Sequence, residues 1–296
     1  MFVMSGVEES NDTMMFCASC GTAEVDDIKL KKCTACHSVR YCSVKCQRDH
    51  RPQHKRECKK RAAELRDEIL FKQPESTNLG DCPICCLPLP IDPDKSTLWS
   101  CCCKTICNGC DNASRKLQHV CPFCRHPAPN SEEEIRKNFM KRVEANDPVA
   151  ALEMGVRNYS EGDYDGAFKY YTKATELGNI LAHHNLSLMY RRGECVEKDE
   201  KKELHHLEQA AIGGNPIARY NLGCYESERL MYERAVKHWI IAANLGDDDS
   251  MKMVKEGFQR GLVSKDDFAA ALRAHHAAVD ATKSPQRVAA EKSKYY

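Results

Sequence analysis

The sequence predicts a multidomain protein in which two small cysteine-rich fingers precede an all-α solenoid of helical repeats. The chain has 296 residues, enough for about two domains of ordinary size, or more if some are small. Of its 19 cysteines, 17 lie between Cys17 and Cys124. From Asp147 onward the sequence repeats itself with spacings of 32 and 36 residues, which is typical of stacked helical hairpins.

The overall charge gives no basis for bulk electrostatic attraction. Lysine and arginine number 44 and aspartate and glutamate 43, so the formal net charge is +1, and general binding to nucleic acid or anionic membranes is unsupported. No run approaches the roughly 18 apolar residues of a membrane helix, and residues 1–16 have no basic and apolar signal segment. We therefore expect a soluble intracellular protein, cytoplasmic or nuclear, without membrane contact, whose residues 1–16 are disordered.

The first cysteine block has the spacing of metal ligands. Disulfides explain an odd number of closely spaced cysteines poorly, and zinc is favoured over both disulfides and an iron–sulfur cluster. Eight candidate ligands fill two tetrahedral sites with no position open for water, which indicates structural rather than catalytic zinc. These candidates are Cys17, Cys20, Cys33, Cys36, Cys42, Cys46, His54 and Cys58.

The order of these ligands resembles the MYND-type zinc finger over residues 17–58, including Tyr41 before the fifth ligand. The resemblance implies two interleaved zinc sites and a surface for short proline-containing peptides. Residues 17–61 carry 12 basic and 5 acidic residues, so acidic residues flanking such a peptide would be favoured. The resemblance assigns Cys17, Cys20, Cys42 and Cys46 to one ion and Cys33, Cys36, His54 and Cys58 to the other.

Between the two cysteine blocks, residues 59–80 are expected to form a helical linker. Ala62, Leu65 and Ile69 recur on one helical face, and Pro74 stands beyond the expected end of the helix. We interpret this segment as a spacer between the fingers.

The second cysteine block, residues 81–126, contains three Cys-x2-Cys pairs and a run of three cysteines. Its order resembles a RING-like zinc finger, in which the first and third pairs share one zinc ion and the second and fourth share another. Lys104 stands where a RING finger usually has its histidine, and a charged lysine has no lone pair for a metal. The run must then supply the second pair; we favour Cys101 and Cys102, with Cys103 as the alternative. The other pairs are Cys82 with Cys85, Cys107 with Cys110, and Cys121 with Cys124.

The RING resemblance also implies a surface for a ubiquitin-conjugating enzyme. Ile84 lies inside the first pair, Pro122 inside the last, and Arg125 directly after it, as in RING-type ubiquitin ligases. The alternative is that Ile84 and Pro122 only pack the finger and that Arg125 is a solvated cation. Cys86 and the unused cysteine of the run are expected to be small apolar fillers.

Residues 131–283 are predicted to form the helical repeats. Ser131 and Glu134 form a capping box that opens a helix through residue 143. The repeats resemble Sel-one-like repeats, a class related to tetratricopeptide repeats, with a degenerate fourth unit and a closing helix over 265–278. Residues 284–296 are expected to be a disordered tail. Equivalent small residues of the four units are Ala150, Ala182, Ala218 and Ser250, and the units end at Gly178, Gly214 and Gly246.

Three functions remain open at this level. The favoured one is a zinc-binding modular scaffold or adaptor for protein–protein interactions, with no catalytic residue and no cofactor besides zinc. The alternative is a RING-type ubiquitin ligase, which would make the protein an enzyme acting through a ubiquitin-conjugating enzyme. Nucleic-acid binding is less favoured, because no finger has the histidine-pair spacing of DNA-reading modules. Some methyltransferases carry a MYND finger, but the second finger and the repeats account for the rest of this chain.

Overall fold

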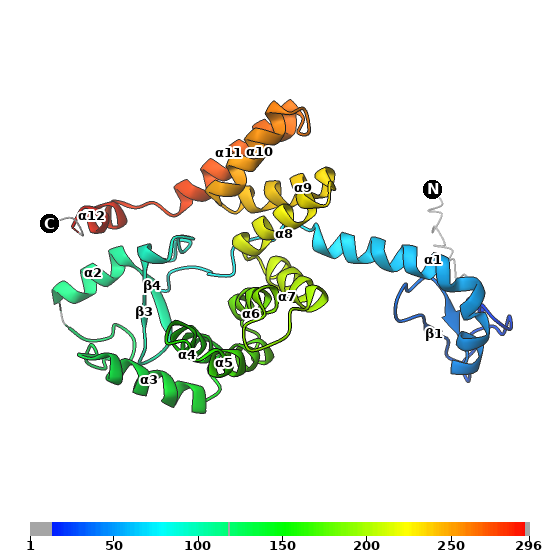
Figure 1. Ribbon diagram of the computed structural model, residues 1–296, viewed down its shortest axis with the longest axis horizontal. Helices are drawn as coiled ribbons and strands as arrows, with labels where there is room; N and C mark the ends of the chain where they lie inside the picture. The colour runs from blue at the N-terminus through cyan, green and yellow to red at the C-terminus, as the bar shows by residue number, and fades with distance from the viewer. Residues whose placement is uncertain (1–13, 118, 294–296) are drawn as a thin grey trace, which may run out of the picture. The chain divides into compact units, whose positions relative to one another are not determined.

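The computed structural model describes residues 14–117 and 119–293, and the chain forms two compact units, residues 1–70 and 71–296 (Figure 1). The prediction of disorder for residues 1–16 falls mostly on residues 1–13, which lie outside the described residues. The first unit contains the first cysteine block. The second unit contains the second block together with the helical repeats.

The first unit is a short antiparallel hairpin followed by one long helix. The helix begins after Ser43, whose hydroxyl accepts a hydrogen bond from the Cys46 N–H at 3.2 Å. It passes through Pro52 and extends to residue 70, so the predicted linker helix and the helix of the finger are one element. The elements are β1 (Lys31–Lys32), β2 (Arg40–Tyr41) and α1 (Val44–Leu70).

The second finger is a β-hairpin followed by a helix. Trp99 closes the hairpin opposite Lys104, and its indole N–H donates to the buried Asp111 carboxylate at 3.1 Å. Arg115, on the same helix as Asp111, donates to this carboxylate at 2.7 Å. The Trp99 hydrogen bond therefore ties the helix to the hairpin. The elements are the 3₁₀ turn η1 (Pro93–Lys95), β3 (Ser96–Trp99), β4 (Lys104–Cys107) and α2 (Asn108–Leu117).

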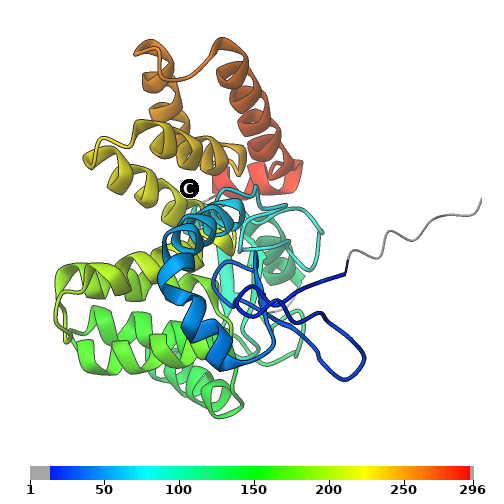
Figure 2. The same ribbon diagram turned by 90° about the vertical axis from the view of Figure 1, so that its right-hand side faces the viewer.

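The helical part follows the predicted repeat. The first helix of each unit starts at an Asp or Asn whose side chain accepts the N–H of the residue three positions later, and these acceptors are Asp147, Asn179, Asn215 and Asp247. The three units end on glycines with φ of 86°, 85° and 95°, in the left-handed region that favours glycine. Figures 1 and 2 show the resulting helix pairs stacked on one another. The helices are α3 (Glu132–Glu144), α4 (Pro148–Ser160), α5 (Tyr164–Glu176), α6 (Ile180–Arg192), α7 (Glu200–Ile212), α8 (Pro216–Glu228), α9 (Tyr232–Asn244), α10 (Asp248–Gln259) and α11 (Lys265–Ala281).

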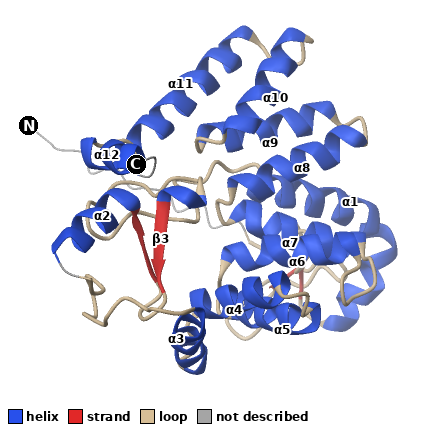
Figure 3. Ribbon diagram, turned by 60° about the vertical axis from the view of Figure 1, so that its left-hand side comes forward, coloured by secondary structure: helices blue, strands red, loops and turns tan. Residues whose placement is uncertain are grey.

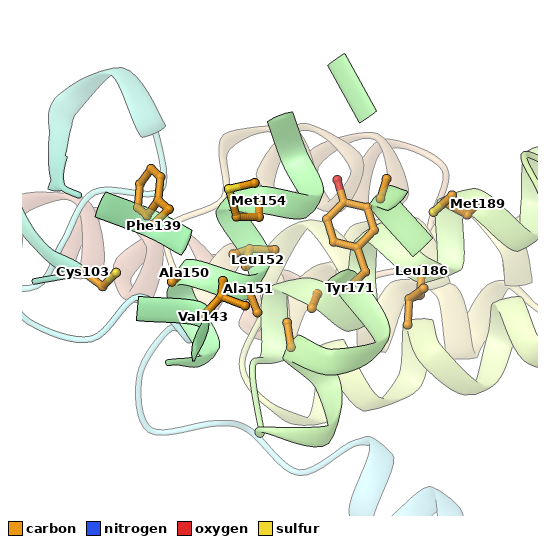
Figure 4. Packing of buried hydrophobic residues seen from close by; sticks show 13 residues of the cluster. Cys103, Phe139, Val143, Ala150, Ala151, Leu152, Met154, Tyr171, Leu186 and Met189 are labelled. Carbon is orange, nitrogen blue, oxygen red and sulfur yellow. The ribbon is translucent and has the colours of Figure 1, made fainter. Parts of the chain in front are cut away.

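The core of the first repeats extends into the second finger. Cys103, from the turn of the β3–β4 hairpin, is buried in the same apolar cluster as Phe139 of α3 and Ala150 of α4 (Figure 4). Asn138 of α3 also donates to the Ser100 hydroxyl at 3.4 Å. The hairpin therefore lies against the first helices of the solenoid, as Figure 3 also shows.

Two segments differ from their predictions. Residues 71–80 are not a free spacer, because Phe71 packs on His238 with ring centroids 4.7 Å apart and the Asn78 N–H donates to the Gly214 carbonyl at 3.1 Å. The tail is not disordered over residues 285–293, which form helix α12 (Pro285–Ser293) packed on α2. Residues 294–296 lie outside the described residues.

Candidate metal centres and peptide groove

The structure brings the sixteen predicted ligands together in four groups of four. Within each group the ligand atoms all lie within 4.8 Å of one another. The grouping is the interleaved arrangement expected from both resemblances. The groups are Cys17, Cys20, Cys42 and Cys46 (set 1); Cys33, Cys36, His54 and Cys58 (set 2); Cys82, Cys85, Cys107 and Cys110 (set 3); and Cys101, Cys102, Cys121 and Cys124 (set 4).

The distances between the sulfur atoms fit one ion per set. Four thiolates at about 2.3 Å from a tetrahedral zinc ion lie roughly 3.8 Å from one another. The Sγ atoms of Cys33 and Cys58 are 3.7 Å apart, and those of Cys85 and Cys107 are 3.8 Å apart. In set 4, the Sγ atoms are 3.4 Å apart in Cys101 and Cys124 and 3.6 Å apart in Cys102 and Cys121. A disulfide needs about 2.05 Å, and all 19 cysteines are free. Thiolates with one imidazole are the donors that zinc prefers, so the residues present fit this metal.

A repeated backbone turn presents the first ligands of the Cys-x2-Cys pairs. In four of the five Cys-x2-Cys pairs, the residue after the second cysteine donates its N–H to the carbonyl of the first at 2.8–3.0 Å, and its φ is positive. The fifth pair, Cys107 and Cys110, lies where β4 leads into α2. N–H groups inside the turn then point at the first sulfur. In Cys33, burial raises the pKa of the thiol, but hydrogen bonds from the N–H groups of Cys36 and Ala35, together with those from the His54 and Cys36 side chains, lower the pKa to about 6. The thiolate that a metal requires is therefore favoured by the turn itself. The residues with positive φ are Gly21, His37, Cys86 and Arg125.

The run of three cysteines divides between a candidate ligand set and the apolar core. Cys101 and Cys102 lie with set 4, whereas Cys103 is buried among the apolar residues of α3 and α4 (Figure 4). Burial raises the pKa of Cys103 to about 12, which keeps it a neutral thiol. Lys104 is exposed and belongs to none of the four sets. The structure thus places Cys103 in the filler position that the sequence left open.

Cys86 differs from its prediction. It is exposed rather than an apolar filler. It occupies the left-handed position of the turn that follows Cys85, with φ of 54°. The Cys86 N–H donates to the Cys82 carbonyl at 2.8 Å, and the Cys82 N–H donates to the Leu87 carbonyl at 2.9 Å. The backbone turn, not the thiol, therefore determines where Cys86 lies.

The three residues predicted to face a ubiquitin-conjugating enzyme lie on the two knuckles of the second finger. Ile84 is 44% exposed, Pro122 is half-buried, and Arg125 is exposed at a left-handed backbone position. Phe123, which the sequence analysis did not single out, is 37% exposed beside Pro122. The sequence signal that could have pointed to Phe123 is its place between Cys121 and Cys124 of set 4, because these two ligands fix the backbone on both sides of it.

The first finger has a groove with an apolar floor and a basic rim. It has a volume of about 410 Å³ and is lined by Ala35, Tyr41 and Val44 together with residues of set 2. Tyr41 is held in place by its hydroxyl, which lies 3.1 Å from His50 Nδ1. No aspartate or glutamate lines this groove in the described part of the chain. The rim is formed by four cations that follow one face of α1, namely Arg48, Arg51, Lys55 and Lys59.

No helix in the two described ranges is long and apolar enough to span a bilayer.

Comparison with known proteins identifies two of the modules. Residues 17–58 match the family model of the MYND finger, and residues 148–179, 180–215 and 216–247 each match that of the Sel1 repeat. The mouse protein DAP3-binding cell death enhancer 1 is 24% identical over 45% of this chain, which spans about a third of that relative, 34% of its length.

Two solved structures are similar to about half of this chain. A Sel1 repeat protein from Oxalobacter formigenes is 21% identical, with a TM-score of 0.45, over 51% of this chain and 66% of its own. The protective antigen c5321 of uropathogenic Escherichia coli, which displays an SLR fold, is 22% identical, with a TM-score of 0.43, over 51% of this chain and 34% of its own. Residues 17–58 are therefore a MYND finger and residues 148–247 are three Sel1 repeats, so this chain joins a zinc-finger module to helical repeats in a form suited to protein–protein interaction.

Proposed function

We propose that the protein is a zinc-dependent scaffold whose MYND finger binds a short proline-containing peptide flanked by acidic residues. The observation that carries the proposal is the groove of the first finger, with its apolar floor and its rim of four cations, where no described residue contributes a carboxylate. A ring of proline or an aliphatic side chain fits the floor beside Tyr41 and Val44. Carboxylates following it along α1 would lie close to the cations, which are spaced every three or four residues on one helical face.

Peptide binding to the full-length protein tests this proposal. Fluorescence anisotropy would compare a labelled proline-containing peptide with an acidic flank, its Asp/Glu→Asn/Gln version and a scrambled version. We expect the acidic peptide to bind most tightly and its affinity to fall with ionic strength. Lys55→Glu should weaken binding by about tenfold, whereas the same change at Lys60, which does not line the groove, should have a smaller effect. Equal binding of the scrambled peptide would show that the groove does not read the sequence.

We also propose four zinc ions, one in each set of ligands. The support is the common geometry of the four sets, which have sulfur–sulfur separations suited to one ion. With four protein ligands in each set, no coordination position is left for substrate, so the ions would be structural. Native mass spectrometry should find four zinc ions on the intact chain. Reduced thiols held by zinc also support a cytoplasmic or nuclear location for the protein.

A RING-type ubiquitin ligase activity of the second finger is the second candidate function. It is favoured by the exposure of Ile84 and Phe123 on its two knuckles, where large apolar side chains are available to a partner. The chemistry would take place on a ubiquitin-conjugating enzyme, with Arg125 steadying the bound ubiquitin. An autoubiquitination assay over a panel of conjugating enzymes would compare the wild type with Ile84→Ala, Arg125→Ala and Cys121→Ala. Lack of activity across the panel would leave the scaffold function alone.

A further inference from the structure

Helix α12 lies directly against the backbone of the second finger, between two ligands of set 3. Gly109 of α2 stands between Cys107 and Cys110, and a Cβ atom there would lie 2.9 Å from the backbone nitrogen of Arg287. It would also lie 3.0 Å from the carbonyl carbon of Gln286. Only glycine allows this approach, so the start of α12 is packed against the part of α2 that carries the metal ligands.

The side chain of Arg287 reaches the metal ligands themselves. It is 7% exposed, and its guanidinium donates to the carbonyls of Pro88 and Thr282 at 2.7 Å and of Leu87 at 3.1 Å. Its fourth hydrogen bond goes to the Sγ of Cys85 at 3.3 Å. No carboxylate pairs with Arg287 among residues 14–117 and 119–293. A buried cation is thus surrounded by three neutral carbonyls and one sulfur.

Such an arrangement is favourable when the sulfur carries charge. A buried guanidinium without a counter-charge is costly, and neutral carbonyls offset only part of this cost. All four ligands of set 3 are cysteines, so a divalent ion bound to their thiolates gives a centre with a net charge of about −2. The Arg287 hydrogen bond would lower the energy of this centre and, in turn, the centre would supply the missing counter-charge.

We propose that Arg287 is an outer-shell residue of the metal centre at set 3, and that docking of α12 and retention of the metal by these four cysteines stabilise each other. This inference rests on the zinc occupancy proposed above. Because linkage is reciprocal, metal loss weakens docking by the same factor by which undocking weakens metal binding. Outer-shell hydrogen bonds are typically worth about 10- to 100-fold in metal affinity. The C-terminal helix is then an indicator of whether set 3 is loaded.

The experiment uses the full-length zinc protein titrated with a competing chelator. N-ethylmaleimide labelling followed by peptide mass spectrometry would report which cysteines become free at each chelator concentration. In Arg287→Gln, the cysteines of set 3 should react at a chelator concentration about 10- to 100-fold lower than in the wild type, with sets 1 and 2 unchanged. Arg287→Lys keeps the charge and should be intermediate, whereas Lys292→Gln, an exposed change on the same helix, should match the wild type.

Hydrogen exchange of residues 285–293 provides the reciprocal readout. Exchange should accelerate at the chelator concentration that exposes the cysteines of set 3, and in the Arg287→Gln protein it should be faster already before chelation. Equal chelator sensitivity of Arg287→Gln and wild type, or unchanged exchange of α12 after set 3 has lost its metal, would overturn the inference. A wild-type protein whose set 3 cysteines react fully before any chelator is added would instead contradict the proposed zinc occupancy. The two failures are therefore distinguishable.

Discussion

Replacing Cys103 by alanine distinguishes a packing thiol from the proposed metal ligands beside it. The Cys103 side chain is buried with Phe139 and Val143, whereas Cys102 lies in set 4. The substitution removes one heavy atom from a closed apolar cluster, which costs about 1–2 kcal/mol from lost burial and the cavity left behind. For a folded unit of this size, such a loss lowers the midpoint of thermal unfolding by roughly 2–8 °C. The number of bound zinc ions should stay the same.

The matched change is Cys102→Ala, which removes a ligand instead of a packing atom. It should lose one zinc ion and with it a large part of the folding energy of the second finger, because metal binding is coupled to folding in such modules. Native mass spectrometry of the two variants, with thermal unfolding followed by circular dichroism, gives both readouts. If Cys103→Ala loses an ion while Cys102→Ala keeps all of them, the assignment of the two cysteines is reversed.

Further changes test the solenoid. Burial lowers the pKa of His206 to about 4, whereas a histidine in the unfolded chain has a pKa of about 6.5. The contribution of neutral His206 to the free energy of unfolding should therefore be complete above a pH of about 6.5 and be lost as the pH falls from about 6.5 to 4. His206→Gln should flatten this pH dependence, as measured by urea unfolding. Gly214→Ala should be more destabilising than Gly162→Ala. Both glycines have positive φ, of 85° and 83°, but of the two only Gly214 would bring a Cβ against backbone, 2.7 Å from the Ser76 carbonyl oxygen. Equal urea midpoints of the two variants would show that residues 71–80 do not constrain the repeat. Asn215→Ala should lose about 1–2 kcal/mol in the same assay, since its side chain caps α8 with a 2.7 Å hydrogen bond, and an unchanged midpoint would contradict that role.

The sequence predicted features that depend on local spacing. The small residues that recur in the four units are all fully buried in the structure, and the glycines that end the first three units have positive φ. These small residues are Ala150, Ala182, Ala218 and Ser250. The all-α repeat region and the finger at residues 17–58 were predicted for the same reason, because ligand spacing and helix period are short-range properties. The groove on the first finger was only partly predictable: the charge of α1 could be counted, but the apolar floor depends on how the turn at Ala35 meets Val44.

Features that depend on distant contacts were missed. Residues 284–296 are short and carry only a local start signal, Ser284, whose hydroxyl accepts the Arg287 N–H at 3.2 Å. Helix α12 is held in place because Gly109 leaves space for its backbone and Arg287 has four acceptors on the finger and the preceding turn. Short isolated helices are marginal in water, so most of the stability of α12 must come from this docking. The prediction for Cys86 was wrong for a similar reason. Free cysteines are usually buried, but the backbone turn after Cys85 places Cys86 at an exposed position.

The second finger has a larger structural role than its size suggests. Its hairpin contributes Cys103 to the core of the first repeat helices, and its helix α2 and first knuckle hold α12 beyond the last repeat helix. A solenoid normally has two free ends, and each end loses stability because it has one neighbour instead of two. Here both ends contact the second finger, so loss of the zinc ions proposed for this finger would remove the support of both ends together. We expect the repeats of the chelated protein to unfold at a lower urea concentration than those of the zinc protein, although none of the four ligand sets found in the described residues includes a repeat residue. Equal urea midpoints would show that the second finger does not stabilise the solenoid.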